Sequence, residues 1–444
     1  MQLVSWYQRI VEKLLPGGTL RRHYYGLGLA GARVIRNEGW RSFFKKVWNR
    51  ATLVIPTYKQ LVYTLNCLKA ISKSSHYNRE SGTLEVLHIP YVPDEPTQGM
   101  LINSLKRNGV SVYIGKRYNL FSLIRSIEAQ VKPHLIHLHW AHGFVLGKSR
   151  IRTIIRSLSF LSELLLLRLC RIKIVWTVHN MVSHESPYPC LELFVNRLIA
   201  LFCDQLIVHS NSIKLQVQSK YRLPNSKPIN VIYQMNYIDY YENSTGELDA
   251  RKKLSLKPED FVFLYFGMVR PYKGLNELVD CFNQLEINGE TDNVKLLIVG
   301  KPLNQMIHDD LLNRCATNTN IIPILKWIDD MEVQIYMNAA NVTVFPFENI
   351  LNSASVVLAM SFSKPVIAPA MGGIPEILGS EGGFIYTALE KNGLLNAMKR
   401  ALECKPNELK AMGDRNFEKI KEFTPEFSGA KTRDVYRRCL EAQR

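Results

Sequence analysis

Short apolar segments alternate with helical segments along most of this chain, and this alternation constrains the fold more than any other feature. From Thr83 onward, runs such as LEVLHIPY, VSVYIG and HLIHLHW are continuous apolar segments of strand length. In the stretches between them, apolar residues recur every three to four positions, as in helices. Strands that are apolar on both faces are typical of parallel sheets covered by helices on both sides. The sequence therefore predicts an α/β protein built on doubly wound parallel sheets.

The alternation occurs in two blocks that a polar segment separates. The first block covers residues 83–245 and includes the further strands KIVWTVHN and DQLIVHS. The polar stretch Tyr241–Pro258 leads into a second block at residues 258–424, with strands FVFLYFG, VKLLIVG, NVTVFPF and PVIAPA. We expect two Rossmann-like domains that face a cleft, the usual place for a small-molecule site. We expect residues 425–444 to form a helix that packs back on the first domain.

Helical spacing is clearest in two of the segments between strands. Residues 275–285 follow the FVFLYFG strand and have the spacing of an amphipathic helix. A second helix is predicted over residues 119–131, where five apolar residues share one face: Leu120, Leu123, Ile124, Ile127 and Val131.

Positive charge is concentrated at the start of the chain. The sequence has 56 lysines and arginines against 39 aspartates and glutamates, a formal net charge of +17. Residues 1–80 hold fourteen of these basic residues and three acidic ones, which leaves 14 − 3 = 11 of the excess charges there. We interpret residues 1–80 as a basic N-terminal extension with an amphipathic helix before Pro16. This extension either packs on the main body as solvated helices or binds an anionic membrane surface.

Part of this extension has a strand, a turn and a helix in succession. Residues 51–71, ATLVIPTYKQLVYTLNCLKAI, resemble the opening of family two glycosyltransferases, which have the GT-A fold. The metal-binding Asp-x-Asp that such a domain needs does not follow. We therefore interpret residues 1–80 as carrying a truncated glycosyltransferase-like leader without catalytic residues.

Composition and motifs exclude several classes of protein and favour one compartment. The eight cysteines are scattered without paired spacing, so neither a zinc site nor a disulfide framework is indicated, and a reducing compartment is favoured. No segment approaches the roughly 18 uninterrupted apolar residues of a spanning helix. Nucleic-acid-binding motifs are absent and the excess charge lies outside the two blocks, so we expect no nucleic acid partner. We predict a cytoplasmic protein, with peripheral binding to the cytoplasmic face of the inner or plasma membrane as an option.

The strongest chemical motif is FGMVRPYKG, residues 266–274, which lies directly after a strand and before a helix. Gly267 permits close approach of a ligand to the backbone, and the following helix start carries partial positive charge. Arg270 and Lys273 add two cations that suit a diphosphate. The motif therefore predicts a phosphate-binding turn.

With this motif in place, residues 83–444 resemble a family four (group 1) glycosyltransferase of GT-B architecture. The resemblance implies that Gly267 lies under the phosphates of a nucleotide-sugar donor. Arg270 and Lys273 would then neutralise the leaving nucleoside diphosphate, a role that can replace a metal ion. It also implies retention of anomeric configuration, no cofactor and no metal, with the nucleotide-diphosphate sugar as co-substrate.

The stretch from residue 345 to residue 378 matches the family's donor-sugar region but departs from its pattern. Members of the family usually carry two glutamates with seven residues between them in this region, and here the aligned positions are Ile350 and Leu358. Neither side chain can hydrogen-bond a sugar or ribose hydroxyl. Nearby polar groups could replace them, and in the WIDD loop Asp329 or Asp330 is expected to cap the next helix while the loop backbone meets the nucleotide base. The predicted donor-binding residues are Gly267, Ile328, Glu348, Asn352, Ser353, Ser355, Gly372 and Gly373, the two last being more typical of turn glycines.

The first block contributes histidines at strand ends. By the same resemblance, His179 in the segment TVHN helps to hold the donor sugar and the reaction centre, and Asn180 replaces the usual aspartate. The segment HLHWAHG is assigned to the acceptor side or to a structural role through His139, Trp140 and His142. A zinc site is disfavoured because no cysteine or carboxylate accompanies this spacing. The basic and leucine-rich residues 147–171 form either a membrane-facing helix, as in the family, or a solvated helix.

Our leading hypothesis is a glycosyltransferase of polysaccharide or cell-envelope biosynthesis. The predicted catalytic residues are His179, Arg270 and Lys273, and the predicted partners are a nucleotide sugar and a saccharide or polyprenyl-linked acceptor. Two alternatives stay open at this point: a catalytically inert or partner-dependent subunit that binds sugar nucleotides, and a sugar-nucleotide epimerase.

Overall fold

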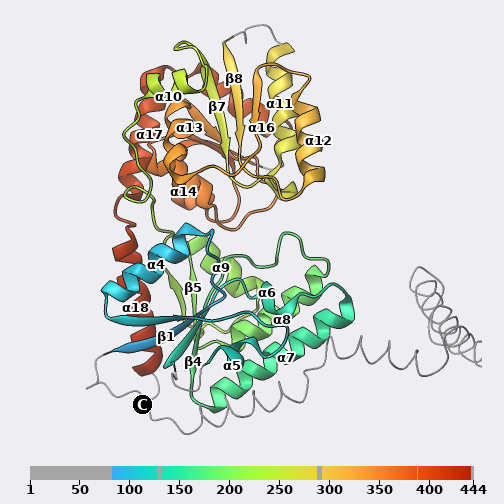
Figure 1. Ribbon diagram of the computed structural model, residues 1–444, viewed down its shortest axis with the longest axis vertical. Coiled ribbons are helices and arrows are strands. Elements are labelled where there is room, and N and C mark those ends of the chain that lie inside the picture. Colours follow the sequence, from blue (N-terminus) through green and yellow to red (C-terminus); the bar gives the residue numbers. More distant parts are fainter. Residues whose placement is uncertain (1–82, 128–132, 288–292, 388, 442–444) are drawn as a thin grey trace, which may run out of the picture.

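The computed structural model describes residues 83–127, 133–287, 293–387 and 389–441. Figure 1 shows two domains, one above the other, each with helices on both sides of a central sheet. The predicted basic helices and the glycosyltransferase-like leader of residues 1–80 lie outside the described residues. The prediction of two doubly wound parallel sheets is confirmed.

The N-terminal domain contains a six-stranded parallel sheet with the strand order β2-β1-β3-β4-β5-β6. Its strands are β1 (Leu84–Ile89), β2 (Val110–Ile114), β3 (Leu135–Leu138), β4 (Lys173–Thr177), β5 (Gln205–Val208) and β6 (Ile229–Val231). Its helices are α4 (Pro96–Arg107), α5 (Ser122–Ser126), α6 (His142–Val145), α7 (Arg150–Leu169), α8 (Pro189–Phe202) and α9 (Asn211–Lys220). All four residues of β3 and of β5 are buried, as expected for strands covered on both faces.

The C-terminal domain repeats this plan with the strand order β12-β11-β10-β7-β8-β9, again parallel throughout. Its strands are β7 (Phe261–Phe266), β8 (Val294–Val299), β9 (Ile321–Ile324), β10 (Val342–Val344), β11 (Val366–Pro369) and β12 (Gly383–Tyr386). Its helices are α10 (Glu247–Lys253), η2 (Pro271–Lys273), α11 (Leu275–Ile287), α12 (Gln305–Cys315), η3 (Asp330–Glu332), α13 (Val333–Ala339), α14 (Ala354–Ser361), α15 (Ile374–Leu378), α16 (Gly393–Glu403) and α17 (Pro406–Ile420).

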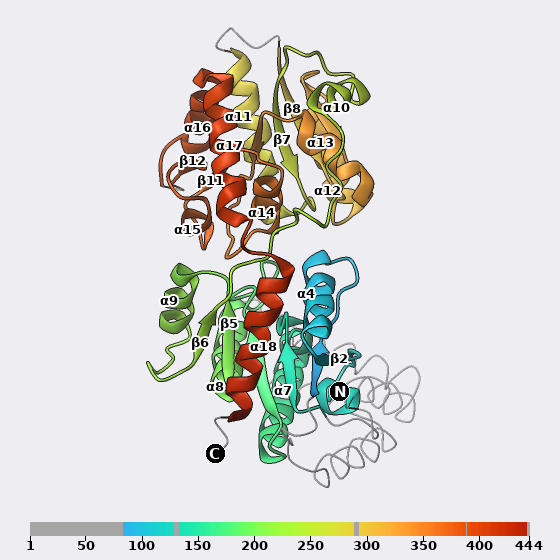
Figure 2. The ribbon, with the colours of Figure 1, turned by 90° about the vertical axis from the view of Figure 1, so that its left-hand side faces the viewer.

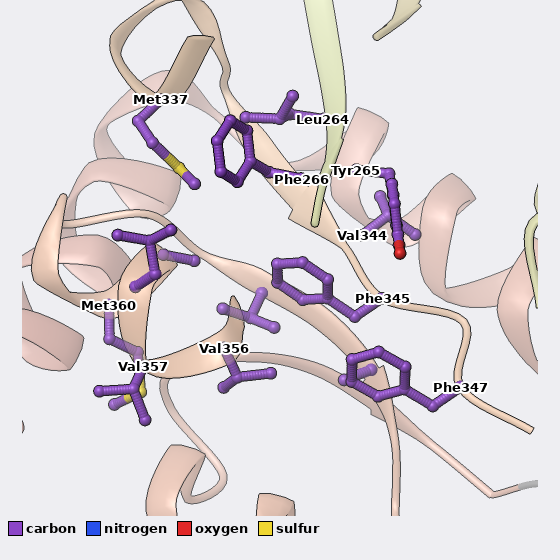
Figure 3. Close-up of a cluster of buried hydrophobic side chains, with 14 of the residues drawn as sticks. Leu264, Tyr265, Phe266, Met337, Val344, Phe345, Phe347, Val356, Val357 and Met360 are labelled. Carbon is purple, nitrogen blue, oxygen red and sulfur yellow. The ribbon is translucent and has the colours of Figure 1, made fainter. Parts of the chain in front are cut away.

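An aromatic and aliphatic core supports the carboxyl ends of β7 and β10. Figure 3 shows side chains of β7, β10, α13 and α14 that meet there, among them Phe266, Met337, Phe345 and Val356. Phe345 and Phe347 stack with ring centroids 5.7 Å apart, and both are almost completely buried. This packing holds the loops that leave β7 and β10 in fixed positions, which matters because both loops reach the cleft.

The chain passes between the domains twice, and the two crossing segments are hydrogen-bonded to each other. The backbone N–H of Asn236 donates to the carbonyl oxygen of Phe423 at 2.8 Å, and its side-chain amide donates to that of Ile420 at 2.8 Å. After the second crossing, α18 (Pro425–Glu441) runs along the N-terminal domain beside α4, as Figure 2 shows. On α18, Tyr436 places its hydroxyl 3.0 Å from Nε2 of His88 and 2.6 Å from Nδ1 of His137.

The predicted helix over residues 119–131 is much shorter in the structure. Helix α5 has five residues, because Phe121 has a left-handed backbone conformation with φ 54° and Ile127 is extended. The carboxylate of Glu163, from α7, accepts hydrogen bonds from the backbone N–H groups of Leu123 and Ile124 at 2.8 and 3.0 Å. A buried acid on another helix thus fixes where this helix starts, which periodicity cannot reveal. Among the described helices, none is both long and apolar enough to cross a membrane.

Candidate active site

A cleft of about 670 Å³ lies between the two domains, where loops follow the carboxyl ends of strands from both sheets. This is the position expected for ligands in open parallel sheets. Nine of the residues predicted from the sequence line it: His139, Trp140, His142, His179, Arg270, Lys273, Asn352, Ser353 and Ser355.

The turn after β7 forms the basic part of the C-terminal wall. Gly267 has φ 147°, and a Cβ atom there would lie 2.9 Å from Oγ of Ser355, so a larger residue would crowd the start of α14. Arg270 precedes η2, and its Nη1 lies 2.7 Å from Oε1 of Glu185 in the N-terminal domain. The turn therefore presents a guanidinium to the cleft, held by a carboxylate from the opposite wall.

Lys273 is the second cation of this turn, and its side chain is only 9% exposed. Burial, together with the positive charge of Arg270, lowers its pKa to about 8, while the negative charge of Glu95 opposes this shift. Its Nζ lies 4.6 Å from the ring centroid of Phe347 and 5.2 Å from that of Tyr272. A desolvated ammonium beside a guanidinium favours an anionic ligand that both cations can contact.

The start of α14 completes the C-terminal wall. The side chain of Ser353 caps this helix by accepting a hydrogen bond from the N–H of Val356 at 3.2 Å. Ala354 and Ser355 in the first turn also line the cleft, so the positive end of the helix dipole faces it. Ile350, at one of the two substituted glutamate positions, lines the cleft with an apolar side chain, whereas Leu358 is buried within α14.

Five of the predicted donor residues do not line the cleft. Gly267 lies behind Ser355, Ile328 is buried in the core, and Glu348 is exposed, its N–H donating to the carbonyl oxygen of Tyr272 at 3.0 Å. Gly372 and Gly373 form a tight turn against the loop at Leu351 and the start of α9, as a Cβ at Gly372 would lie 2.2 Å from the Leu351 carbonyl oxygen. In the WIDD loop, Asp329 caps η3 by accepting from the N–H of Met331 at 3.0 Å.

The N-terminal wall is built around His179, which follows β4. Its Nε2 lies 3.0 Å from Nδ1 of His139, and its ring stacks on Trp140 with centroids 4.4 Å apart and planes 12° apart. Burial holds the pKa of His179 well below its usual value, and the neighbouring His209 and His142 lower it further. The imidazole is therefore neutral at pH 7. Asn352 reaches across from the C-terminal domain and donates to the carbonyl oxygen of His179 at 3.2 Å.

Three buried histidines on one face of β1 and β3 form a group with ligand atoms that could hold a metal ion: His88, His137 and His139. Both ring nitrogens of His137 are engaged, Nδ1 with Tyr436 and Nε2 with Thr177 at 2.7 Å. No cysteine or carboxylate belongs to this group of described residues. We therefore interpret it as a hydrogen-bonded part of the core that joins α18 to the sheet.

Sequence reasoning missed several charged or aromatic residues of the N-terminal wall. Glu95, Arg117, His184 and Glu185 line the cleft. His184 stacks on Tyr272 with ring centroids 3.9 Å apart, next to the Glu185–Arg270 ion pair. All four follow the carboxyl ends of β1, β2 or β4, so a survey of every loop after a predicted strand could have identified them.

A second contact between the domains lies at Glu376 of α15. Its carboxylate accepts hydrogen bonds from the backbone N–H groups of Asn211 and Ser212 at 2.9 and 2.8 Å, and from the hydroxyl of Tyr233 at 2.8 Å. Partial burial alone would raise the pKa of this carboxyl, but these hydrogen bonds outweigh it and lower the pKa to about 2. Glu376 thus binds the positive end of α9 and ties the domains together.

This contact predicts a pH-dependent stability. Because the folded pKa lies below the usual 4.5, the contribution of Glu376 is complete above pH 4.5 and declines as the pH falls toward 2. Glu376→Gln should lower the melting temperature at pH 7, and the difference from wild type should shrink between pH 5 and pH 3. Glu381→Gln removes an exposed glutamate nearby and is the matched control. A difference that stays constant with pH would contradict the assignment.

The sequence of the C-terminal domain matches a known family. The family model described as glycosyl transferases group 1 matches residues 247–419, which include the Arg270–Lys273 turn and α14. Residues 247–419 thus form a group 1 glycosyltransferase domain.

Relatives share sequence with the chain, and solved structures share its fold. This glycosyltransferase is 24% identical to GDP-mannose:glycolipid 4-beta-D-mannosyltransferase of Xanthomonas campestris pv. campestris, over 61% of this chain and 72% of the relative. Sucrose-phosphate synthase from Thermosynechococcus elongatus superposes with a TM-score of 0.66 at 18% identity, covering 81% of this chain and 100% of its own. The Anabaena protein HepE, in complex with UDP and glucose, gives 0.60 at 16% identity, covering 80% and 99%. The predicted GT-B fold of the glycosyltransferase is confirmed.

Proposed function

We propose that this glycosyltransferase takes a sugar from a nucleotide-diphosphate donor bound to the C-terminal wall and transfers it to a saccharide or lipid-linked saccharide on the N-terminal wall. The observation that carries the proposal is the pair of cations, Arg270 and Lys273, beside the start of α14 in the interdomain cleft. Guanidinium, ammonium and helix N-terminus together suit a diphosphate. The Xanthomonas relative is named for GDP-mannose and a glycolipid, which supports this class of donor and acceptor.

The proposal includes transfer without a metal ion. The described residues that line the C-terminal wall include no carboxylate, which is the ligand that a diphosphate-bound Mg²⁺ or Mn²⁺ usually needs from the protein. Arg270 and Lys273 supply positive charge at the place where the leaving diphosphate develops its negative charge. These two side chains thus take the role that a metal ion takes in other transferases.

Retention of configuration is the third part of the proposal. With no side chain required as nucleophile, the leaving phosphate itself can accept the proton of the attacking hydroxyl. Comparison of the anomeric configuration of donor and product by NMR tests this point. A product of opposite configuration would contradict retention and would require a base, for which Glu95 and Glu185 are the carboxylates that line the cleft in the described chain.

A membrane-facing surface fits a lipid-linked acceptor. Helix α7 exposes apolar side chains at helical spacing, and the exposed basic residues Lys148 and Arg150 lie at its start. Such a surface suits peripheral binding to anionic lipid. Its exposed apolar residues are Ile151, Ile154, Leu158, Leu165 and Leu169.

Ligand-induced thermal shifts test the donor site first. Binding to the folded state raises the melting temperature, so one of UDP, GDP and ADP should stabilise the full chain, equally with and without EDTA. Arg270→Ala should abolish the shift, because the guanidinium contacts the diphosphate. Absence of any shift with the three nucleotides, or a shift that EDTA removes, would contradict the proposal.

A further inference from the structure

Two neutral histidines contact each other in the N-terminal wall, and only one arrangement of their protons avoids a buried N–H group without an acceptor. The contact joins Nδ1 of His139 to Nε2 of His179 at 3.0 Å. In a hydrogen bond between two neutral imidazoles, one nitrogen carries the proton and the other accepts it. Burial holds the pKa of both rings well below the usual value, so neither carries a second proton at pH 7.

The surroundings of His139 decide between the two arrangements. Its side chain is 3% exposed, and its Nε2 is buried without a hydrogen-bond partner among the described residues. If Nε2 carried the proton, a buried N–H donor would have no acceptor, which costs more than an unused lone pair. The proton of His139 is therefore placed on Nδ1, from which it is donated to Nε2 of His179.

The tautomer of His179 follows directly. Since its Nε2 accepts the hydrogen bond from His139, the single proton of His179 is on Nδ1, the ring nitrogen that His139 does not use. Stacking on Trp140 at 4.4 Å holds the plane of the ring, and the hydrogen bond with His139 keeps Nε2 on the His139 side. His179 lines the cleft, and the nitrogen that it has available for a ligand is thus an N–H donor.

We infer that His139 is a positioning residue that holds His179 as a hydrogen-bond donor toward an oxygen atom of the donor sugar or its phosphate, and that His179 does not act as a base. This inference rests on the proposed function for the identity of the ligand. The assignment of the tautomer is independent of the proposed function. A donor at this position can stabilise negative charge on oxygen as the glycosidic bond breaks. It cannot remove the proton of the acceptor hydroxyl, because the lone pair it would need is already used by His139.

Nitrogen NMR of the full chain tests the tautomer without any assay of activity. With [15N]histidine labelling, the shifts and proton couplings of the two ring nitrogens distinguish the Nδ1–H from the Nε2–H form, and His179→Gln identifies the signal. We expect the neutral Nδ1–H tautomer at pH 7. An Nε2–H tautomer, or a doubly protonated ring, would overturn the inference even if nucleotides bind as proposed.

Two substitutions of His139 separate positioning from packing. His139→Asn places an amide N–H close to the former Nδ1, whereas His139→Phe keeps the ring but removes the hydrogen bond. We expect His139→Phe to lower kcat by about 10- to 100-fold with a smaller change in the donor KM, and His139→Asn to restore most of that loss. Equal losses in the two variants, with unchanged melting temperatures, would overturn the positioning role. Failure of the wild-type protein to bind any of the nucleotides would instead count against the proposed function.

Discussion

Replacement of Arg270 by alanine is expected to lower kcat/KM for sugar transfer by about 10²- to 10³-fold, and Lys273→Ala should have a similar effect. Both cations contact the charge that develops on the leaving diphosphate in the proposed reaction. Lys273 is almost fully buried, and its pKa is lowered to about 8. A cation from the protein surface or from solvent therefore cannot replace its ammonium group beside the diphosphate. The measurement is the initial rate of donor consumption with saturating and subsaturating donor.

Two further variants make this experiment specific. Arg270→Lys keeps the charge but cannot form two parallel hydrogen bonds to a phosphate, so we expect an intermediate loss. Lys301→Ala removes an exposed cation at the end of the neighbouring strand β8 and should leave the rate within about twofold. Near-normal rates in Arg270→Ala and Lys273→Ala would remove the basis of the proposed donor site.

Replacement of Gly274 by alanine is expected to lower the free energy of unfolding by about 3 kcal/mol or more. Gly274 lies between η2 and α11 with φ 71°, a conformation that costs other residues about 1–2 kcal/mol. A Cβ atom would also lie 1.9 Å from the carbonyl oxygen of Pro346, so the backbone after β10 would have to move. Denaturant titration followed by circular dichroism measures this loss.

Gly109 offers a matched control for this substitution. It has nearly the same backbone conformation, φ 75°, but a Cβ there would meet nothing within 4 Å. Gly109→Ala should therefore cost only about 1 kcal/mol, the strain of the left-handed conformation. Similar losses in the two variants would show that contact with Pro346 does not constrain the turn.

The sequence predicted those features of the fold and the site that depend on residues close together in the chain. Both parallel sheets follow from apolar runs such as FVFLYF, in which every residue after Phe261 is buried as the pattern requires. The FGMVRPYKG turn could also be located from sequence, because its glycine and two cations lie within a few residues of one another after a strand. Arg270 and Lys273 consequently line the cleft as expected.

Contacts between the two domains could not be predicted from pattern. Glu185 and Arg270 are separated by 85 residues, and Glu376 and Asn211 by 165, so their pairing depends on how the two sheets are docked. The same limit explains Ile328 and Glu348, which lie in the predicted loops but not on the cleft surface. A loop can be assigned from sequence, whereas the direction of each side chain depends on its packing.

The hydrogen bonds of Asn236 to the second crossing segment join the two connections between the domains at one place. Because Asn236 is hydrogen-bonded to Phe423 and Ile420, the two crossing segments are joined at one place, and we expect the domains to rotate relative to each other about it. A rotation about that place changes the distances Arg270–Glu185, Asn352–His179 and Glu376–Asn211 together. We therefore expect a compound that contacts both walls of the cleft to slow this rotation of the domains. We therefore expect release of products to be coupled to the opening of the domains.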